Sequence, residues 1–269
     1  MHGAGNLPAQ GQAYFMSLLL DLEKTNTARP VDAVPLRLIP GRRVITIQPN
    51  KKSRLVFLTE PTGLAAEQYK LLRHRLCTLH PIGGTMLITS PGPGEGKTLT
   101  SVNLAWCLAD AGHRACLVDL DFRAPGISPA LGYAFEEDGV EDVLTGIRTI
   151  SQSVRQIGGC SLYVLGVKNR LASPGELLSS ASITPLLANL RATFQWVILD
   201  IAPVIPMADV AEVLPYADGA LMVIRSGKTD KSMVATSLAI LGSKLWGVVV
   251  NDSPINGSSY YDYYGNHKD

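Results

Sequence analysis

From residue 62 onward, short apolar runs alternate with longer segments in which apolar residues recur every three or four positions. Apolar residues at helical spacing predict an amphipathic helix over 63–79. Strands are predicted over 85–89, 114–120, 161–165, 196–199, 219–224 and 246–250, and helices over 98–111, 183–194, 209–214 and 231–241. Strands that are apolar almost throughout and alternate with helices are typical of a parallel sheet buried on both faces. The predicted class is therefore α/β, a doubly wound and mainly parallel sheet with helices on both faces.

The two ends of the chain lack this pattern. Residues 1–54 predict a flexible basic N-terminal arm with one short helix near Tyr14 to Glu23, and residues 253–269 predict a mobile tail. The predicted folded domain spans residues 55–252. The arm has a net charge of +5 and the rest of the chain −4. Such an arm is either simply solvated or attracted to an anionic membrane face or an acidic partner.

Composition narrows the class of protein further. The chain has 269 residues, of which 46% are hydrophobic and 17% charged, and its net charge is +1. A disordered or nucleic-acid-coating protein would be less apolar and further from neutrality, so no nucleic-acid partner is expected. No apolar run approaches the roughly 20 residues that cross a bilayer, and no Lys or Arg precedes Lys24 as a secretory signal would require. With four cysteines and no C-x-x-C pair, we expect a cytoplasmic protein with free thiols.

A glycine-rich loop follows the first predicted core strand and precedes a helix. It reads Ser90-Pro-Gly-Pro-Gly-Glu-Gly-Lys-Thr98. Backbone N–H groups of such a loop and of the helix start surround phosphate oxygens. In this pattern Lys97 reaches the β and γ phosphates and the Thr98 hydroxyl coordinates magnesium. The usual first glycine is replaced by Pro91, but the strand–loop–helix placement predicts a P-loop NTPase.

Three carboxylates accompany this loop in the sequence. Asp119 and Asp121 stand at the end of the next predicted strand, where alternation places them on one face. Asp200 ends the strand over 196–199. Carboxylates beside a phosphate loop hold magnesium through water or accept a proton from a nucleophile.

These motifs resemble those of the bacterial tyrosine kinases, within the larger MinD/ParA-like group of P-loop ATPases. Asp119-x-Asp121-x-Arg123-x-Pro125 is similar to their additional Walker A′ box. Other similar segments are Pro174-Gly-Glu-Leu-Leu178, Asp200-Ile-Ala-Pro-Val204 and a tyrosine-rich tail. Glu67, Lys70 and Arg73 resemble the family's E-x-x-R-x-x-R oligomerisation motif, with lysine at the middle position. The resemblance covers about three quarters of the chain and implies that 55–252 is a P-loop kinase domain.

The resemblance also implies roles for individual residues. The catalytic residues would be Lys97, Asp119, Asp121 and Asp200, with Asp119 orienting or deprotonating the tyrosine hydroxyl. ATP would be bound by Gly94, Glu95, Gly96, Lys97, Thr98, Leu99 and Asn251, of which Asn251 contacts the adenine in related ATPases. Magnesium would be held by Thr98, Asp121 and Asp200.

The tail supplies the expected phosphoacceptors. Four of the chain's nine tyrosines are Tyr260, Tyr261, Tyr263 and Tyr264. The family resemblance implies autophosphorylation of this cluster in trans within a ring, which regulates exopolysaccharide or capsule biosynthesis and export. It further implies a membrane polysaccharide co-polymerase as activator, a cognate tyrosine phosphatase, and a location peripheral to the inner membrane through that partner.

Two other functions remain open at this point. A MinD/ParA-like positioning ATPase would hydrolyse ATP without phosphorylating tyrosine, although the lysine of that branch is replaced by Gly92. A nucleotide-binding regulator without catalysis would keep the fold alone, and the altered Ile201-Ala202 segment is compatible with it.

Overall fold

A nine-stranded sheet forms the centre of the protein. The computed structural model describes residues 15–20, 43–49 and 53–253. The strand order is β1-β9-β8-β3-β7-β4-β6-β5-β2. The six strands from β9 to β6 run parallel, whereas β1 is antiparallel to β9, and β5 is antiparallel to β6. The mainly parallel, doubly wound architecture is confirmed.

The bounds of the elements follow the predicted pattern closely within the core. The strands are β1 (Phe15–Leu20), β2 (Arg43–Ile45), β3 (Gly84–Thr89), β4 (Ala115–Asp119), β5 (Arg155–Ile157), β6 (Leu162–Leu165), β7 (Trp196–Asp200), β8 (Gly219–Arg225) and β9 (Leu245–Ser253). The α-helices are α1 (Val56–Thr59), α2 (Leu64–Leu79), α3 (Lys97–Asp110), α4 (Ile127–Leu131), α5 (Val140–Leu144), α6 (Ile150–Ser153), α7 (Ser180–Thr193), α8 (Asp209–Val213) and α9 (Lys231–Leu241).

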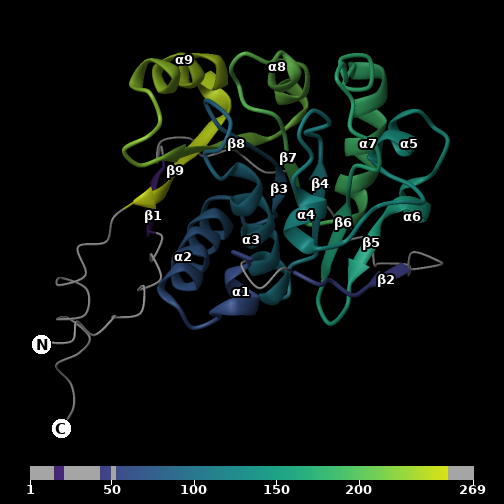
Figure 1. Ribbon diagram of the computed structural model, residues 1–269, viewed down its shortest axis with the longest axis horizontal. Coiled ribbons are helices and arrows are strands. Elements are labelled where there is room, and N and C mark those ends of the chain that lie inside the picture. Colours follow the sequence, from purple (N-terminus) through teal and green to yellow (C-terminus); the bar gives the residue numbers. More distant parts are fainter. Residues whose placement is uncertain (1–14, 21–42, 50–52, 254–269) are drawn as a thin grey trace, which may run out of the picture.

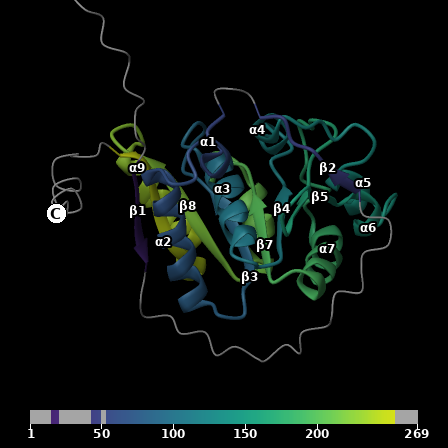
Figure 2. The same cartoon turned by 90° about the horizontal axis from the view of Figure 1, so that it is seen from below.

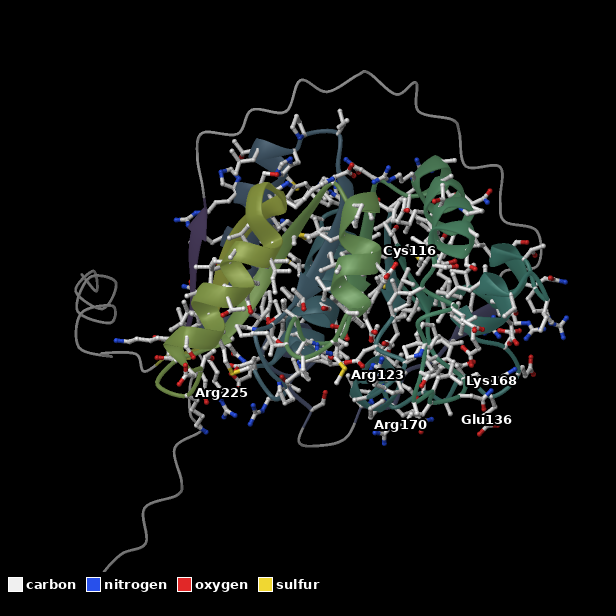
Figure 3. The ribbon with its side chains drawn as sticks, turned by 90° about the horizontal axis from the view of Figure 1, so that it is seen from above. Cys116, Arg123, Glu136, Lys168, Arg170 and Arg225 are labelled. Carbon is white, nitrogen blue, oxygen red and sulfur yellow. The ribbon has the colours of Figure 1, made fainter. Side chains whose placement is uncertain are left out.

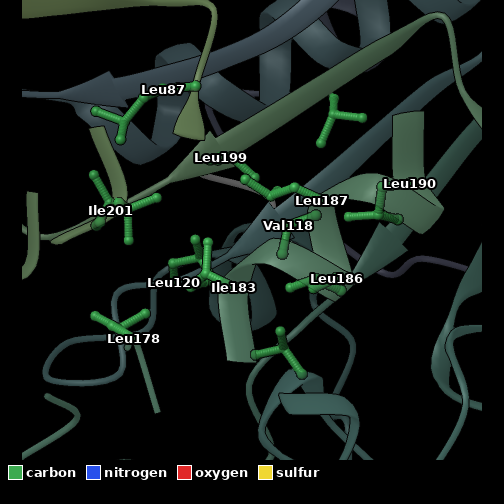
Figure 4. Close-up of a cluster of buried hydrophobic side chains, with 14 of the residues drawn as sticks. Leu87, Val118, Leu120, Leu178, Ile183, Leu186, Leu187, Leu190, Leu199 and Ile201 are labelled. Atoms are coloured by element: carbon green, nitrogen blue, oxygen red, sulfur yellow. The ribbon is translucent and has the colours of Figure 1, made fainter. Parts of the chain in front are cut away.

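Helices cover the two faces of this sheet. Figure 1 shows α7, α8 and α9 along one side and α1 to α4 along the other, and Figure 2 shows α2 and α3 lying over the latter face. Successive side chains of a strand point to opposite faces. In β7, accordingly, Trp196 and Ile198 join the apolar cluster beneath α3, whereas Val197 and Leu199 join the one beneath α7. Figure 4 shows this second cluster, in which leucine and isoleucine side chains of α7 meet those of the strands.

The N-terminal prediction is wrong in part. Phe15–Leu20, expected within a short helix, form β1, which pairs with β9 from Phe15↔Ser253 to Leu20↔Gly247. A short apolar run suits a strand and a helix equally, and the open edge of β9 decides the outcome here. Arg43–Ile45 likewise add β2 to the opposite edge. The sheet therefore includes two strands from the predicted arm, and Ser253, assigned to the tail, ends β9.

Within the described residues, no helix is long and apolar enough to span a membrane. All four cysteines are free. Residues 1–14, 21–42 and 50–52 of the arm, and the tail after residue 253, lie outside the described residues.

Candidate functional site

The glycine-rich loop joins β3 to α3 at the carboxyl edge of the sheet. Gly94 and Gly96 have φ of 78° and 97°, in the left-handed region that favours glycine. A Cβ on Gly96 would lie 2.1 Å from the Asn251 amide nitrogen, so a side chain at this position would displace that amide. The loop is also held from the side, because the Val204 N–H donates to the Ser90 carbonyl at 2.8 Å. The loop is thus tied to the segment that follows β7.

Lys97, the first residue of α3, faces the three predicted carboxylates. Its Nζ lies 2.6 Å from Asp121 Oδ2 and 3.9 Å from Asp200 Oδ2. It also donates to Thr98 Oγ1 at 3.3 Å. Lys97, Asp119, Asp121 and Asp200 are all buried. The structure therefore brings the four predicted catalytic residues together around the start of one helix.

Sheet register explains why Asp119 and Asp200 meet. They are the last residues of the neighbouring strands β4 and β7 and are paired directly across the ladder. By strand alternation, both also lie on the face of the sheet that packs against α3 rather than α7. Each keeps further partners: Asp119 accepts the backbone N–H groups of Asp121 and Ile127 at 3.1 and 3.2 Å. Asp200 Oδ1 accepts the Ser101 hydroxyl at 3.0 Å.

Burial and mutual repulsion determine the electrostatics of the cluster. Burial, followed by the negative charge of Asp200, raises the pKa of Asp119 well above its ordinary value. Burial also raises the pKa of Asp200, although Lys97 opposes that rise. For Lys97 burial lowers the pKa, but Asp200 and Asp121 outweigh it, so the net shift is upward. Lys97 therefore stays charged, while Asp119 is a stronger base than an exposed aspartate.

One buried oxygen in this cluster lacks a hydrogen bond. Asp200 Oδ2 is buried and has no hydrogen-bond partner among the described residues. A buried carboxylate oxygen without a partner is costly unless a ligand, ion or water completes it. Within the described part of the chain, no three His, Cys, Asp or Glu side chains form a ready-made metal cage. Mg²⁺ commonly binds through one or two carboxylates together with water and phosphate oxygens, and the residues present fit that mode.

Arg123 of the Walker A′-like box is held by a residue that the sequence analysis did not select. Its Nε and Nη2 donate to the two carboxylate oxygens of Asp209 at 3.0 and 3.2 Å. Its Nη1 also donates to the Ala172 carbonyl. Asp209 begins α8 and is buried. In the sequence, Asp209 could have been recognised as an acidic residue at the start of a predicted helix, nine residues after Asp200.

Ser101 was also missed, although it lies four residues after Lys97 and hence on the same face of α3. Gly126 is a third such residue: a Cβ there would lie 2.8 Å from Thr98 Cγ2, so the A′ segment packs directly on the phosphate loop.

Asn251 near the end of β9 contacts the phosphate loop. Its amide donates to the Glu95 carbonyl at 3.0 Å, and the Glu95 carboxylate accepts the Thr229 hydroxyl. Leu99 lies half-buried in the first turn of α3. Arg225 pairs with Asp252, its Nη2 2.6 Å from Oδ2.

The predicted oligomerisation residues lie on α2, away from the phosphate loop. Lys70 pairs with Glu67 at 2.7 Å on the surface. Arg73 instead turns toward α3 and donates to the Cys107 carbonyl at 3.1 Å. The four tail tyrosines lie outside the described residues.

The comparisons with known proteins first define the class. Residues 86–214 match the model of the CobQ/CobB/MinD/ParA nucleotide binding domain. Together with the strand–loop–helix and its carboxylates, this match makes the protein a nucleotide-binding P-loop NTPase.

Relatives that match two thirds or more of the chain then define the family. "Tyrosine-protein kinase YwqD" of Bacillus subtilis is 33% identical over 82% of this chain and 97% of its own length. "Succinoglycan biosynthesis transport protein ExoP" of Rhizobium meliloti is 31% identical over 67% of this chain, which spans 24% of that longer protein. Among solved structures, the chimerical protein CapA2B2 superposes with a TM-score of 0.70 and 26% identity, covering 78% of this chain and 93% of that one. The chain belongs to the bacterial tyrosine kinases.

Proposed function

We propose that this protein is an ATP- and Mg²⁺-dependent protein-tyrosine autokinase that phosphorylates its C-terminal tyrosine cluster in trans. One observation carries the proposal: a P-loop lysine faces three buried carboxylates in a chain whose relatives are tyrosine-protein kinases. The acceptors are Tyr260, Tyr261, Tyr263 and Tyr264.

The phosphate loop binds the nucleotide. Backbone N–H groups of Gly94 to Leu99 surround its phosphates, and Lys97 exchanges the Asp121 carboxylate for phosphate oxygens. That exchange frees Asp121 to join Thr98 and Asp200 in holding Mg²⁺, in part through water. ATP would supply the γ-phosphoryl group, and Mg²⁺ held there would offset the charge that develops during its transfer. Asn251 fixes the loop and lies at the predicted nucleotide-binding edge.

Asp119 acts on the acceptor tyrosine. A phenol has a pKa of about 10, so a base of raised pKa assists its deprotonation more than an ordinary aspartate would. The phenol oxygen bonds to the γ phosphorus, its proton passes to Asp119, and the bond to the β–γ bridging oxygen breaks to release ADP. Lys97 stabilises the negative charge on the transferring group.

The proposal extends to the cellular setting. Residues 55–252, together with the strands β1 and β2 that the predicted arm adds to their sheet, form the kinase domain, which carries a tyrosine-rich tail. Glu67, Lys70 and Arg73 contribute to a ring in which neighbours exchange tails. A membrane polysaccharide co-polymerase activates the kinase and keeps it peripheral to the inner membrane, and a cognate phosphatase reverses the modification. The process served is exopolysaccharide or capsule biosynthesis and export, in keeping with the name of the relative ExoP, a succinoglycan biosynthesis transport protein.

An anti-phosphotyrosine blot after incubation with MgATP tests the activity. Phosphotyrosine is expected on the full chain, and it is expected to disappear when the four tail tyrosines become phenylalanine. A matched control replaces Tyr133, a half-buried tyrosine of the folded domain, by phenylalanine and keeps the signal. Phosphate release without phosphotyrosine would favour a positioning ATPase, and nucleotide binding without either product would favour a non-catalytic regulator.

A further inference from the structure

The loop after β6 runs beside the Walker A′-like box. The Leu171 N–H donates to the Phe122 carbonyl at 2.8 Å, and the Ala172 carbonyl accepts Arg123 Nη1. Phe122 follows Asp121 directly. Arg170 is therefore one residue away from a backbone that is bonded to the catalytic segment.

The same loop is also fixed on the other side of Arg170. The backbone N–H groups of Lys168 and Asn169 donate to Glu141 Oε1 at 3.1 and 2.7 Å. The Lys168 ammonium pairs with Asp142 at 2.9 Å. The backbone that carries Arg170 is thus held on both sides, which reduces the entropy lost when its side chain binds a partner.

Charge pairing separates Arg170 from the other cations on this edge. Figure 3 shows Arg123, Lys168, Arg170 and Arg225 along one edge of the protein. Arg123 pairs with Asp209, Lys168 with Asp142 and Arg225 with Asp252. Arg170 is exposed and makes no hydrogen bond or ion pair with any described residue. It is an available cation on a rigid support beside the site.

Within its tyrosine cluster the tail offers one complementary charge. Between Ser253 and Asn266 the only charged side chain is Asp262, which lies at the centre of the cluster Tyr260 to Tyr264. In an extended peptide successive residues are about 3.3 Å apart, so Asp262 lies within about 7 Å of whichever tyrosine enters the site. A guanidinium binds a carboxylate through two parallel hydrogen bonds.

We infer that Arg170 is a specificity-determining residue that binds the acidic residue beside the acceptor tyrosine, Asp262 in the tail of a second copy. This inference rests on the proposed function and adds to it a preference for an acid within two residues of the acceptor. Arg170 takes no part in the chemical step. It lowers the KM for the tail and leaves kcat unchanged.

Binding of a fluorescent peptide covering residues 254–269 tests this inference on the full chain. Fluorescence anisotropy is measured with Mg²⁺ and a non-hydrolysable ATP analogue, so the readout does not require catalysis. Arg170→Glu is expected to raise the Kd about tenfold, equivalent to about 1.4 kcal/mol. Arg114→Glu is the matched control, since Arg114 precedes β4 at the sheet edge opposite the phosphate loop and is expected to leave the Kd unchanged.

Peptide variants identify the partner of Arg170. Asp262→Asn in the peptide is expected to cost the wild-type protein the same tenfold and to cost the Arg170→Glu protein nothing more. Asp262→Lys is expected to restore binding to the Arg170→Glu protein. The inference would be overturned by an unchanged Kd in Arg170→Glu or by absence of peptide binding to the wild type. It would also be overturned if Arg170→Glu weakened binding of the native and the Asp262→Asn peptides equally. Phosphorylation of the native peptide, measured separately, reports on the kinase itself, so the two failures are distinguishable.

Discussion

Replacing Lys97 by methionine removes the only lysine or arginine that pairs with the buried Asp121–Asp200 cluster in the described part of the chain. Methionine has a similar length, so the change tests charge more than packing. The substitution is also the natural kinase-dead control, and its effect on stability must therefore be separated from its effect on catalysis.

The magnitude follows from the burial of the cluster. The Lys97 side chain is 11% exposed, and those of Asp121 and Asp200 are 3% and 0% exposed. Removing one partner of such a buried pair costs about 3–5 kcal/mol, because the remaining charges stay buried and uncompensated. Protonation of the carboxylates removes their charge and so reduces part of this cost.

Because of this protonation, the loss in the free energy of unfolding depends on pH. Lys97 lowers the pKa of both Asp119 and Asp200, so its loss raises the pKa of each further. A carboxyl whose folded pKa lies above its unfolded value of about 3.9 favours folding at low pH and loses that contribution as pH rises through the folded pKa. Each unit of further rise is worth about 1.4 kcal/mol. Lys97→Met should thus destabilise the protein more at pH 8 than at pH 5.5.

Urea unfolding followed by tryptophan fluorescence measures both free energies, because Trp196 is fully buried. Lys231→Met, at an exposed position in α9, is the matched control and should be neutral at both pH values. Combining Lys97→Met with Asp121→Asn should recover part of the loss. A destabilisation below 1 kcal/mol, or one that is equal at pH 5.5 and pH 8, would refute this account of the cluster.

Three further predictions concern the same site. Asp119→Asn should lower kcat by about 10²–10⁴-fold with ATP affinity retained. In the wild type, the rate should fall as pH decreases through a value above the ordinary aspartate pKa of about 3.9. An Asp119→Asn variant with full activity would exclude a base at this position. Gly96→Ala should abolish ATP binding in calorimetry and destabilise the protein by about 1–2 kcal/mol from its left-handed backbone alone. Gly175→Ala, with open space around it, should bind ATP normally. Equal ATP binding by the two variants would contradict the steric argument. Arg123→Lys should lose the bidentate contact to Asp209 and reduce kcat/KM for tail phosphorylation. Adding Asp209→Asn to that variant should reduce kcat/KM little further. Fully additive losses in kcat/KM would show that the two residues do not act together.

Local sequence patterns predicted the core of the fold because there one face or both faces of each element are buried. The strand ending at Asp200 and the helix starting beside Lys97 were predicted within a residue of their observed bounds. β1 was not, because the same apolar run fits a helix, and only pairing with β9 across more than 200 residues selects the strand. The short helices α4, α5 and α6 were also missed, since four or five residues carry too little periodicity to be recognised.

The site shows the same division between local and long-range information. Residues carried by a motif, such as Lys97 and Asp121, were predicted because their spacing along the chain matters for phosphate binding. The contact of Arg73 with α3 and that of Arg123 with Asp209 depend on how separate segments pack together. No local pattern specifies such contacts, because both residue types also occur as solvated surface charges.

Transfer between copies is the central claim, and one mixing experiment tests it directly. An active chain that lacks its last ten residues provides the kinase, and a full-length Lys97→Met chain provides the acceptor tyrosines. With MgATP, the account predicts phosphotyrosine on the Lys97→Met chain only when both chains are present. No phosphotyrosine in the mixture, from an active chain whose full-length form labels itself, would contradict transfer in trans.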